Sequence, residues 1–453
     1  MAKKSLFSAF KLISALTVIS RIFGFLRDIV FAQYLGASIS ADAFFVAFKL
    51  PNLFRRLTAE GALTNAFLPV YSSLKIREGL SKALIFAAEI QTILLIILLI
   101  VVLILEIFMP FIIYFLAPGF INTPERMDAA IEIARFTIPY LPMISLVALW
   151  SAITNANDDF FSAAFSPIIM NVFLIGSAIL IPFTSGLFNF GMALIAFPLA
   201  IGVLLAGISQ ILFLQIRLRR KKLNPVWRKI TFSSEGKKMW LSFFPAAIGA
   251  GIIQINLFVD MILASFLKIG SISWLYYADR IAQLPLGVVG IALGTALLPK
   301  LSAYESKKQY KQIKVEITNA FKIASIFVLP ATLSIFVISE EIISGLFERG
   351  KFNNDDVIAT SKALIAYGVG LPAFVAIKIL QPAIYAMKKN VFILKISLYS
   401  ILINIVLSII LMKNFGHMGI AMATSFTGWF GFAYHLSFLV SNERINFNFV
   451  NIF

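Results

Sequence analysis

The sequence predicts an all-α protein that crosses a membrane many times, and composition is the first reason. Of 453 residues, 60% are hydrophobic and 13% are charged, whereas soluble globular proteins carry about 25% charged residues. The segment 83–108 has only Glu89, Gln91, Thr92 and Glu106 as polar interruptions, and about 20 apolar residues suffice for a helix to span a bilayer. The absence of cysteine and the presence of only two histidines exclude disulfides, thiolate catalysis and Cys/His zinc sites.

Apolar segments follow one another between turn residues and charged loops, and each is too long for a strand, so each predicts a helix. The first two spans contain several charged residues, the next four are more uniformly apolar, and six more follow the basic segment 217–238. In chain order, about twelve spans are predicted at 7–35, 41–74, 83–116, 127–155, 160–183, 187–216, 239–267, 272–300, 315–338, 357–387, 390–412 and 417–440.

The basic residues orient these spans. The segment 217–238 holds nine Lys or Arg and one Glu, and cytoplasmic loops carry such an excess. The other basic positions on the side of the N-terminus are Lys3, Lys4, Lys75, Arg77, Lys82, Lys300, Lys307, Lys308, Lys311, Lys314, Lys388, Lys389 and Arg444. The opposite loops hold only isolated bases, namely Arg126, Lys268, Arg349, Lys351 and Lys413. Both termini are therefore expected in the cytoplasm, and the net charge of +17 reflects topology and predicts no nucleic-acid partner.

The basic segment also divides the chain into two six-helix lobes, 1–216 and 239–453, with 217–238 as a cytoplasmic linker. Weak internal similarity supports a duplication, because Leu68-Pro69 matches Leu298-Pro299 and Tyr140-Leu141-Pro142 matches Gly370-Leu371-Pro372, both at an offset of 230 residues. Parallel repeats of this kind form transporters with a substrate site between the halves. The fold expected is two six-helix lobes around a central cavity. The alternative is that Leu-Pro pairs recur by chance in apolar helices.

Charged residues inside the spans point to function, because each costs about 2.5–3.5 kcal/mol to insert. The first span contains Arg21, Arg27 and Asp28, with Gly24 as a place where the helix can bend. The second span contains Asp42, Lys49, Arg55, Arg56 and Glu60 around Pro51, and the eighth contains Asp279 and Arg280. Four of the arginines lie deep in spans, namely Arg21, Arg27, Arg55 and Arg280.

Guanidinium groups match phosphate oxygens in a two-point geometry and stay charged at physiological pH. Arginines in excess therefore favour a phosphate-bearing substrate, whereas a cavity for cationic drugs would need unpaired carboxylates. The alternative is purely structural ion pairing, with Asp28, Asp42, Glu60 and Asp279 as partners.

At these residues the sequence resembles the MurJ (MviN) lipid II flippases of bacteria, over nearly the whole chain. The matching segments are SRIFGFLRD at 20–28, ADAFFVAFKLPNLFRR at 41–56, AEGA at 59–62, APGF at 117–120, SWLYYADR at 273–280 and GIALGT at 290–295. The resemblance implies the multidrug/oligosaccharidyl-lipid/polysaccharide exporter fold. It also implies transport of undecaprenyl-pyrophosphate-linked disaccharide-pentapeptide (lipid II) from the inner to the outer leaflet for peptidoglycan synthesis, by alternating access.

The family's cavity arginines fall on Arg21, Arg27, Arg55 and Arg280, and its acidic residues on Asp28, Asp42 and Glu60. Lys49 or Arg56 would attract the head group, Asp42 with Arg56 would act as a gate, and Asp279 would support Arg280. The resemblance implies a transporter and not an enzyme, a bacterial inner-membrane location, contact with membrane lipids, and a monomer with cell-wall synthesis enzymes as candidate partners. Family members commonly have fourteen spans, whereas about twelve are predicted before Phe453.

Two sources of energy for transport are considered, a sodium ion and the membrane potential. Asp260, Asn404 and Thr424 from three spans offer oxygen ligands that suit sodium, and some relatives are thought to bind sodium at matching positions. The alternatives are that Asp260 pairs with a neighbouring donor and that the membrane potential drives transport. No other cofactor is expected.

Three other functions remain as alternatives. One is a flippase for another polyprenyl-pyrophosphate oligosaccharide, or a multidrug exporter of the same fold. An integral-membrane polyprenyl-phosphate transferase would need carboxylates for magnesium at the cytoplasmic boundary, where Asp158 and Asp159 are the only candidate pair. A scaffold for cell-wall enzymes would tolerate substitution of the arginines.

Overall fold

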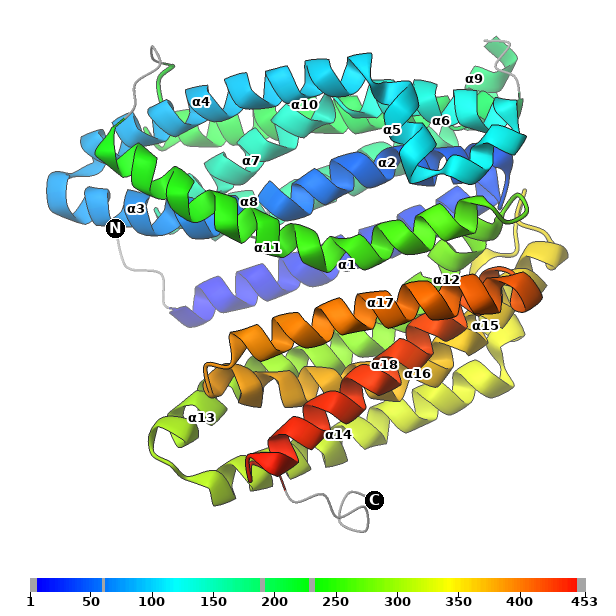
Figure 1. The fold of residues 1–453 in the computed structure, drawn as a ribbon. Helices are drawn as coiled ribbons and strands as arrows, with labels where there is room; N and C mark the ends of the chain where they lie inside the picture. Colours follow the sequence, from blue (N-terminus) through cyan, green and yellow to red (C-terminus); the bar gives the residue numbers. More distant parts are fainter. Residues whose placement is uncertain (1–5, 59–61, 188–191, 228–232, 446–453) are drawn as a thin grey trace. The chain divides into compact units, whose positions relative to one another are not determined.

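The computed structural model describes residues 6–58, 62–187, 192–227 and 233–445, and all regular structure in these ranges is helical (Figure 1). The chain divides into two compact units, Met1–Ile255 and Asn256–Phe453. The boundary between the two units falls inside one long helix, Ser234–Ser265. The lobes 1–216 and 239–453 and their linker stay a prediction.

The first unit is built from helices joined by short connecting segments. They are α1 Leu6–Leu35, α2 Ile39–Thr58, α3 Ala62–Glu78, α4 Leu80–Ile107, α5 Met109–Leu116, η1 Pro118–Asn122, α6 Pro124–Thr137, α7 Tyr140–Asn155, α8 Phe160–Ile179, α9 Ile181–Leu187, η2 Met192–Leu194 and α10 Phe197–Arg220, followed by α11 Ser234–Ser265, which continues into the second unit.

The second unit is helical in the same way. Its helices after α11 are α12 Ser271–Pro285, η3 Leu286–Gly290, α13 Ile291–Ser306, α14 Tyr310–Val337, α15 Ser339–Phe347, α16 Asn354–Ala386, α17 Asn390–Phe415 and α18 His417–Ser441.

The helix ends confirm the offset of 230 residues that the sequence predicted. Four pairs of equivalent ends are separated by this number, as residues 80 and 310 are. The pairs are the starts of α4 and α14 (Leu80 and Tyr310), the ends of the same helices (Ile107 and Val337), the starts of α6 and α16 (Pro124 and Asn354) and the starts of α8 and α17 (Phe160 and Asn390). The two units are therefore copies of one helical plan.

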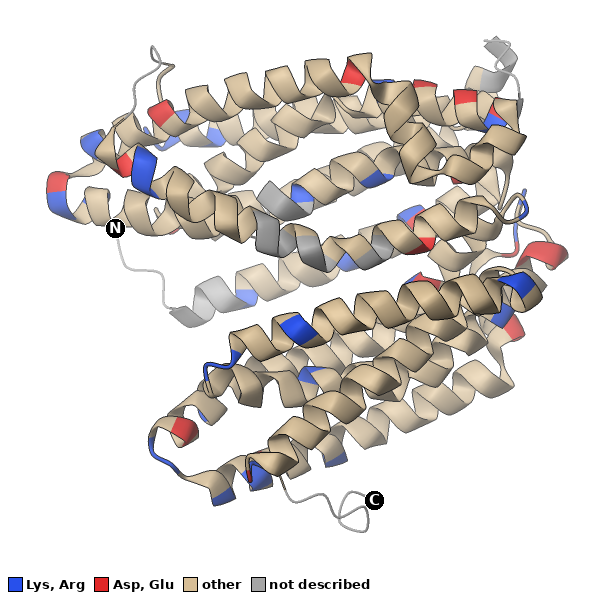
Figure 2. Ribbon diagram, viewed as in Figure 1, with Lys and Arg blue, Asp and Glu red and all other residues tan. Residues whose placement is uncertain are grey.

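Eight helical stretches in the described residues are long and apolar enough to cross a membrane. They are Leu80–Ile107, Pro124–Asn155, Phe160–Ile179, Phe197–Arg220, Ser271–Ser306, Tyr310–Val337, Asn354–Ala386 and Asn390–Phe415. Helices α1, α11 and α18 are also long enough, with 30, 32 and 25 residues. Helix α2 carries Asp42, Lys49, Arg55 and Arg56, so it is much more polar. Figure 2 shows most charged residues near helix ends, with long uncharged stretches between them.

Several predicted spans are interrupted. The span predicted at 83–116 breaks at Phe108, which separates α4 from α5, and the span at 127–155 breaks before α7 at Pro139. Proline lacks the N–H that would continue the helical hydrogen bonds. The span at 272–300 contains the π-helical turn η3 directly after Pro285, and such turns are frequent at functional sites. The span at 41–74 consists of two helices, α2 and α3.

Within the first unit, α1 packs on α8, α8 on α10, and α2 on α6. The start of α11 also belongs to this unit. The backbone N–H of Ser233 donates to Glu89 Oε1 of α4 at 2.8 Å, and Ser233 Oγ accepts from the Gly236 N–H at 2.9 Å. A buried carboxylate and an N-cap serine therefore satisfy donors at the start of α11.

Helix α16 is the centre of the second unit, where α12, α13, α14, α15 and α18 pack against it. Its N-terminus carries a capping box between Asn353 and Asp356. The Trp274 indole N–H of α12 donates to Asp356 Oδ1 at 2.9 Å, and both residues are buried. Close packing of α16 and α18 depends on Gly428, where an added Cβ would lie 2.4 Å from a ring atom of Phe374.

Candidate functional site

Arg27 and Asp28 of the first span form a polar group in the first unit. Arg27 donates to Asp28 Oδ1 through Nε at 3.1 Å and through a terminal nitrogen at 2.7 Å. Its other terminal nitrogen donates to Asn171 Oδ1 of α8 at 3.1 Å, and the guanidinium lies 5.6 Å from the Phe31 ring centroid. The Arg27 side chain is 12% exposed and that of Asp28 is 2% exposed. This guanidinium is therefore fixed by charge, hydrogen bonds and an aromatic ring.

Asn171 also explains how α1 is held at this place. Its Nδ2 donates to the Ser20 carbonyl at 3.2 Å, and an added Cβ at Gly24 would lie 3.7 Å from the same amide. Helix α1 is continuous from Leu6 to Leu35, so Gly24 marks a contact with α8 and not a break in the helix. Asn171 was missed by sequence reasoning because an amide in an apolar run carries no charge.

Asp42 forms a second buried ion pair, with Arg126 of α6. Arg126 donates to Asp42 Oδ2 at 2.5 Å, and the side chains are 2% and 0% exposed. The Arg126 guanidinium also lies 4.0 Å from the Phe120 ring centroid. The sequence suggested Arg56 as the partner of Asp42 and counted Arg126 as an isolated base of an outer loop. The structure pairs Asp42 with Arg126, which is one of the largest fully buried side chains.

The other cations of the first unit lie in more open surroundings. Arg55 is half-buried and its Nε lies 3.5 Å from Asn52 Oδ1, one helical turn earlier. Lys49 is half-buried and Arg21 is exposed. Arg56 belongs to α2, but its side chain lies outside the described residues, as does the whole of Glu60.

Arg280 is the predicted substrate arginine of the second unit. One of its terminal nitrogens donates to the Tyr276 hydroxyl at 3.0 Å, and its guanidinium lies 5.0 Å from the centroid of the same ring. The neighbouring Asp279 accepts a hydrogen bond from Gln283 Nε2. Both hydrogen bonds join residues one turn apart on α12, so donor and acceptor belong to the same helix in each of them.

Two of the three candidate sodium ligands lie together. Asn404 of α17 donates through Nδ2 to Thr424 Oγ1 of α18 at 3.2 Å, and Thr424 donates to the Ile420 carbonyl at 3.2 Å. Asn404 is fully buried, and its Oδ1 has no hydrogen-bond partner among the described residues. Asp260 lies on α11 in the same unit and is half-buried. Amide, hydroxyl and carboxylate oxygens with a buried oxygen left over fit a hard cation.

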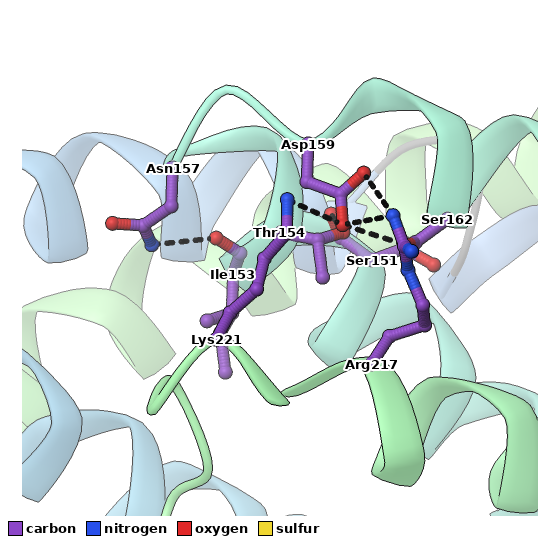
Figure 3. A network of polar contacts seen from close by, with 8 residues as sticks. All are labelled: Ser151, Ile153, Thr154, Asn157, Asp159, Ser162, Arg217 and Lys221. Carbon is purple, nitrogen blue, oxygen red and sulfur yellow. Dashed lines mark hydrogen bonds and ion pairs between the residues drawn. The ribbon is translucent and has the colours of Figure 1, made fainter. Parts of the chain in front are cut away.

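The cytoplasmic end of the first unit, as the sequence orients it, holds one further network, shown in Figure 3. Asp159, between α7 and α8, accepts from Arg217 at 3.1 Å, from Lys221 at 2.9 Å and from Ser162 at 2.8 Å. Burial raises the pKa of the Asp159 carboxyl, but the hydrogen bonds from Lys221 and Ser162 and the charges of Arg217 and Lys221 outweigh it, so the pKa is lowered. Because Asp159 is engaged by two cations, it is a poor magnesium ligand, and the transferase alternative loses its candidate pair.

Two repeated helical units with arginines inside spans define a membrane transporter of the two-lobed exporter class. Comparison with known proteins agrees with this class. The solved inward-facing structure of a multidrug resistance MATE family transporter of the MOP superfamily matches with a TM-score of 0.73 at 16% identity, covering 95% of this chain and 98% of that one. At this identity the match shows the fold alone.

The sequence profile described as lipid II flippase MurJ matches residues 31–450. The probable lipid II flippase MurJ of Rickettsia prowazekii is 36% identical over 443 residues, which cover 98% of this chain and 85% of the relative. That of Rhizobium tropici is 36% identical over 94% of this chain and 79% of the relative. The solved structure of lipid II flippase MurJ in an inward closed conformation matches with a TM-score of 0.81 at 29% identity, over 97% of this chain and 89% of that one. The chain belongs to the MurJ lipid II flippase family.

Proposed function

We propose that this protein moves lipid II from the inner to the outer leaflet of the bacterial cytoplasmic membrane. Membership of the flippase family, with a profile match over residues 31–450, is the observation that carries this function. The arginines inside the spans supply the chemistry, because the substrate is a pyrophosphate. No bond needs to be made or broken, so the protein acts as a transporter and not as an enzyme. The alternatives, another polyprenyl-pyrophosphate glycan or a drug, are not favoured by the family.

Arg27 and Arg280 would replace water around the pyrophosphate while it crosses the hydrocarbon. Arg27 is held by Asp28 and Asn171, so substrate binding would exchange one carboxylate oxygen for a phosphate oxygen of similar geometry. Arg280 donates to the Tyr276 hydroxyl, and its guanidinium would turn to the phosphate oxygens of the substrate. Arg21 and Arg55 would add positive charge along the same route. We infer that a cavity between the lobes opens alternately to the two sides.

Sodium binding would supply the drive. Asp260, Asn404 and Thr424 would hold the ion, and the buried Asn404 Oδ1 without a hydrogen-bond partner among the described residues supports this assignment. A sodium ion at this place would neutralise the charge of Asp260. Replacing sodium by choline at constant membrane potential should slow transport, and Asn404→Leu should remove the sodium dependence. The membrane potential would be the drive if only its collapse stops transport.

The proposal includes an orientation and a set of partners. Both termini face the cytoplasm, because the basic loops lie on their side. The protein works as a monomer among membrane lipids, and enzymes that consume lipid II at the outer leaflet are its candidate neighbours. Cysteine labelling from each side of the membrane checks the orientation, which is convenient because the native chain has no cysteine.

Complementation of a strain depleted of its lipid II flippase tests the function, with accessibility of lipid II at the outer leaflet as the readout. The wild-type chain should restore growth and accessibility. Arg27→Ala and Arg280→Ala should abolish both at normal protein levels, and Arg349→Ala, at an exposed position, should have no effect. A stably inserted wild-type chain that leaves lipid II in the inner leaflet would refute the function, and full rescue by both arginine variants would refute the role of these residues.

A further inference from the structure

The end of α10 carries five basic residues among the six positions 217–222, and the fold uses only two of them. Arg217 and Lys221 lie four residues apart, on one face of the helix end, and both hold Asp159 (Figure 3). The other three side chains are exposed and make no hydrogen bond or ion pair within the described part of the chain. These three are Arg219, Arg220 and Lys222.

These three cations lie at the end of a membrane span. Helix α10, Phe197–Arg220, is long and apolar enough to cross the membrane, so the residues at its end are expected at the level of the lipid head groups. On the proposed orientation this is the cytoplasmic side. Basic residues directly after a span attract anionic lipids at the membrane surface.

The chain turns sharply after α10, and buried contacts fix this turn. The backbone N–H of Lys222 donates to the Arg219 carbonyl at 3.1 Å, and that of Leu223 donates to the Leu218 carbonyl at 2.9 Å. These are the two hydrogen bonds of a Schellman motif, which commonly includes an apolar contact between the residues at the positions of Leu218 and Leu223. Both leucine side chains are buried. The residues after the turn therefore have a defined place beside the helix end.

The turn presents two apolar side chains next to the cations. Gln215 Nε2 donates to Asn224 Oδ1 at 3.0 Å, which ties the returning segment to α10. Val226 and Trp227 follow and are 67% and 52% exposed. Tryptophan is enriched where membrane meets water, because its ring is apolar and its N–H can donate a hydrogen bond.

The combination of charge and apolar surface decides between partners. A nucleic acid or an acidic protein segment would use the cations and leave the exposed valine and tryptophan in water. A phospholipid uses both, since its phosphate is anionic and its acyl chains are apolar. Guanidinium groups also match phosphate oxygens in a two-point geometry.

We propose that Arg219, Arg220 and Lys222 bind the phosphate of an anionic phospholipid, and that Val226 and Trp227 contact the upper part of its acyl chains. This site lies at the surface of the first unit and is separate from the arginines inside the spans. It does not depend on which substrate the protein transports.

Quenching by brominated lipids tests the proposal on the purified full chain in nanodiscs. Val226→Cys gives a single attachment point for a bimane dye, because the native chain has no cysteine. The ratio of binding constants for brominated phosphatidylglycerol and brominated phosphatidylcholine is then measured at this dye. It should be at least about five, the factor that one cation near the membrane surface contributes.

Two triple variants with the same loss of charge are compared in this labelled chain. Arg219→Gln, Arg220→Gln and Lys222→Gln together should lower the ratio to about one. The matched control replaces three exposed lysines of the second unit and should keep the wild-type ratio. Its substitutions are Lys307→Gln, Lys308→Gln and Lys311→Gln. Arg219→Lys combined with Arg220→Lys keeps the charge and should retain most of the preference.

The outcomes separate a local site from a general effect of charge. A ratio near one in the parent labelled chain, or an unchanged ratio in the first triple variant, would overturn the proposal. An equal loss in both triple variants would also overturn it, because the total charge would then be the cause. Trp227→Gln should weaken quenching by both brominated lipids, and unchanged quenching would refute the apolar contact.

The substituted side chains are exposed, so the melting temperatures should stay near that of the parent chain. If the first triple variant does not fold, Arg219→Gln with Arg220→Gln gives the same test. A chain that prefers phosphatidylglycerol in this way but does not move lipid II would refute the proposed function and support this site.

Discussion

The buried pair of Asp42 and Arg126 gives the sharpest test of the physical reasoning. The side chains are 0% and 2% exposed and 2.5 Å apart. Asp42→Asn keeps the shape of the side chain but leaves the guanidinium without its counter-charge. Breaking a buried ion pair from one side costs about 3–5 kcal/mol, because an uncompensated charge remains. The ring of Phe120, 4.0 Å from the guanidinium, recovers only part of this cost, since cation–π contacts contribute about 0.5–2 kcal/mol.

Unfolding in mixed micelles with increasing dodecyl sulfate measures this free energy. Asp42→Asn should lose about 3 kcal/mol or more, whereas Asp42→Leu combined with Arg126→Met should lie near wild type, because both charges leave together. Glu316→Gln is the control, since its partner Lys300 is 3.4 Å away and 59% exposed, and exposed pairs contribute about 0–1 kcal/mol. The reasoning is wrong if Asp42→Asn costs no more than this control, or if the double variant is as unstable as the single one.

Three further predictions concern single contacts. Asp159→Asn should lower the melting temperature at neutral pH. Because the pKa of Asp159 is lowered in the fold, the difference from wild type should begin to shrink only below about pH 4, where the carboxyl of the unfolded wild-type chain takes up a proton before that of the folded chain. A constant difference down to pH 3 would contradict this. Gly419→Ala places a Cβ 2.4 Å from a backbone carbonyl oxygen and should lower the free energy of unfolding by about 1–3 kcal/mol. Gly345→Ala, with no atom within 4 Å of the new Cβ, should instead stabilise its helix by about 0.5–1 kcal/mol. Equal unfolding curves of the two variants would contradict both expectations. Arg444→Lys loses a two-point contact of 2.7 and 2.8 Å with Glu305 and should cost about 1 kcal/mol, and an unchanged melting temperature would show that the contact does not contribute.

Much of the fold could be predicted from the sequence, because each membrane span requires a long run of apolar residues. The two Leu-Pro matches were sufficient to find the offset that the helix ends confirm. The breaks were harder to see. Phe108 is as apolar as its neighbours, so Pro110 in the first turn of α5 is the one sign of the break between α4 and α5. The π-helical turn after Pro285 packs against α16, a contact that the sequence pattern does not reveal.

The candidate site was predicted only in part. Arg27 and Asp28 are neighbours in sequence and are also paired in space. Asn171 and Arg126 were missed for different reasons. Asn171 is neutral, and Arg126 follows a helix start that resembles an outer loop. Partners distant in sequence cannot be assigned without the packing.

The repeat allows one buried position to be compared between the two units. Arg126 and Asp356 are equivalent residues of the two copies, 230 positions apart. Each is buried, and each is joined to the second helix of its own copy, Arg126 to Asp42 on α2 and Asp356 to Trp274 on α12. The two copies therefore join this position to the second helix with opposite polarity, through a cation in the first copy and an anion in the second. Arg126→Asp would therefore not reproduce the contact of the second copy, because the new carboxylate would face that of Asp42.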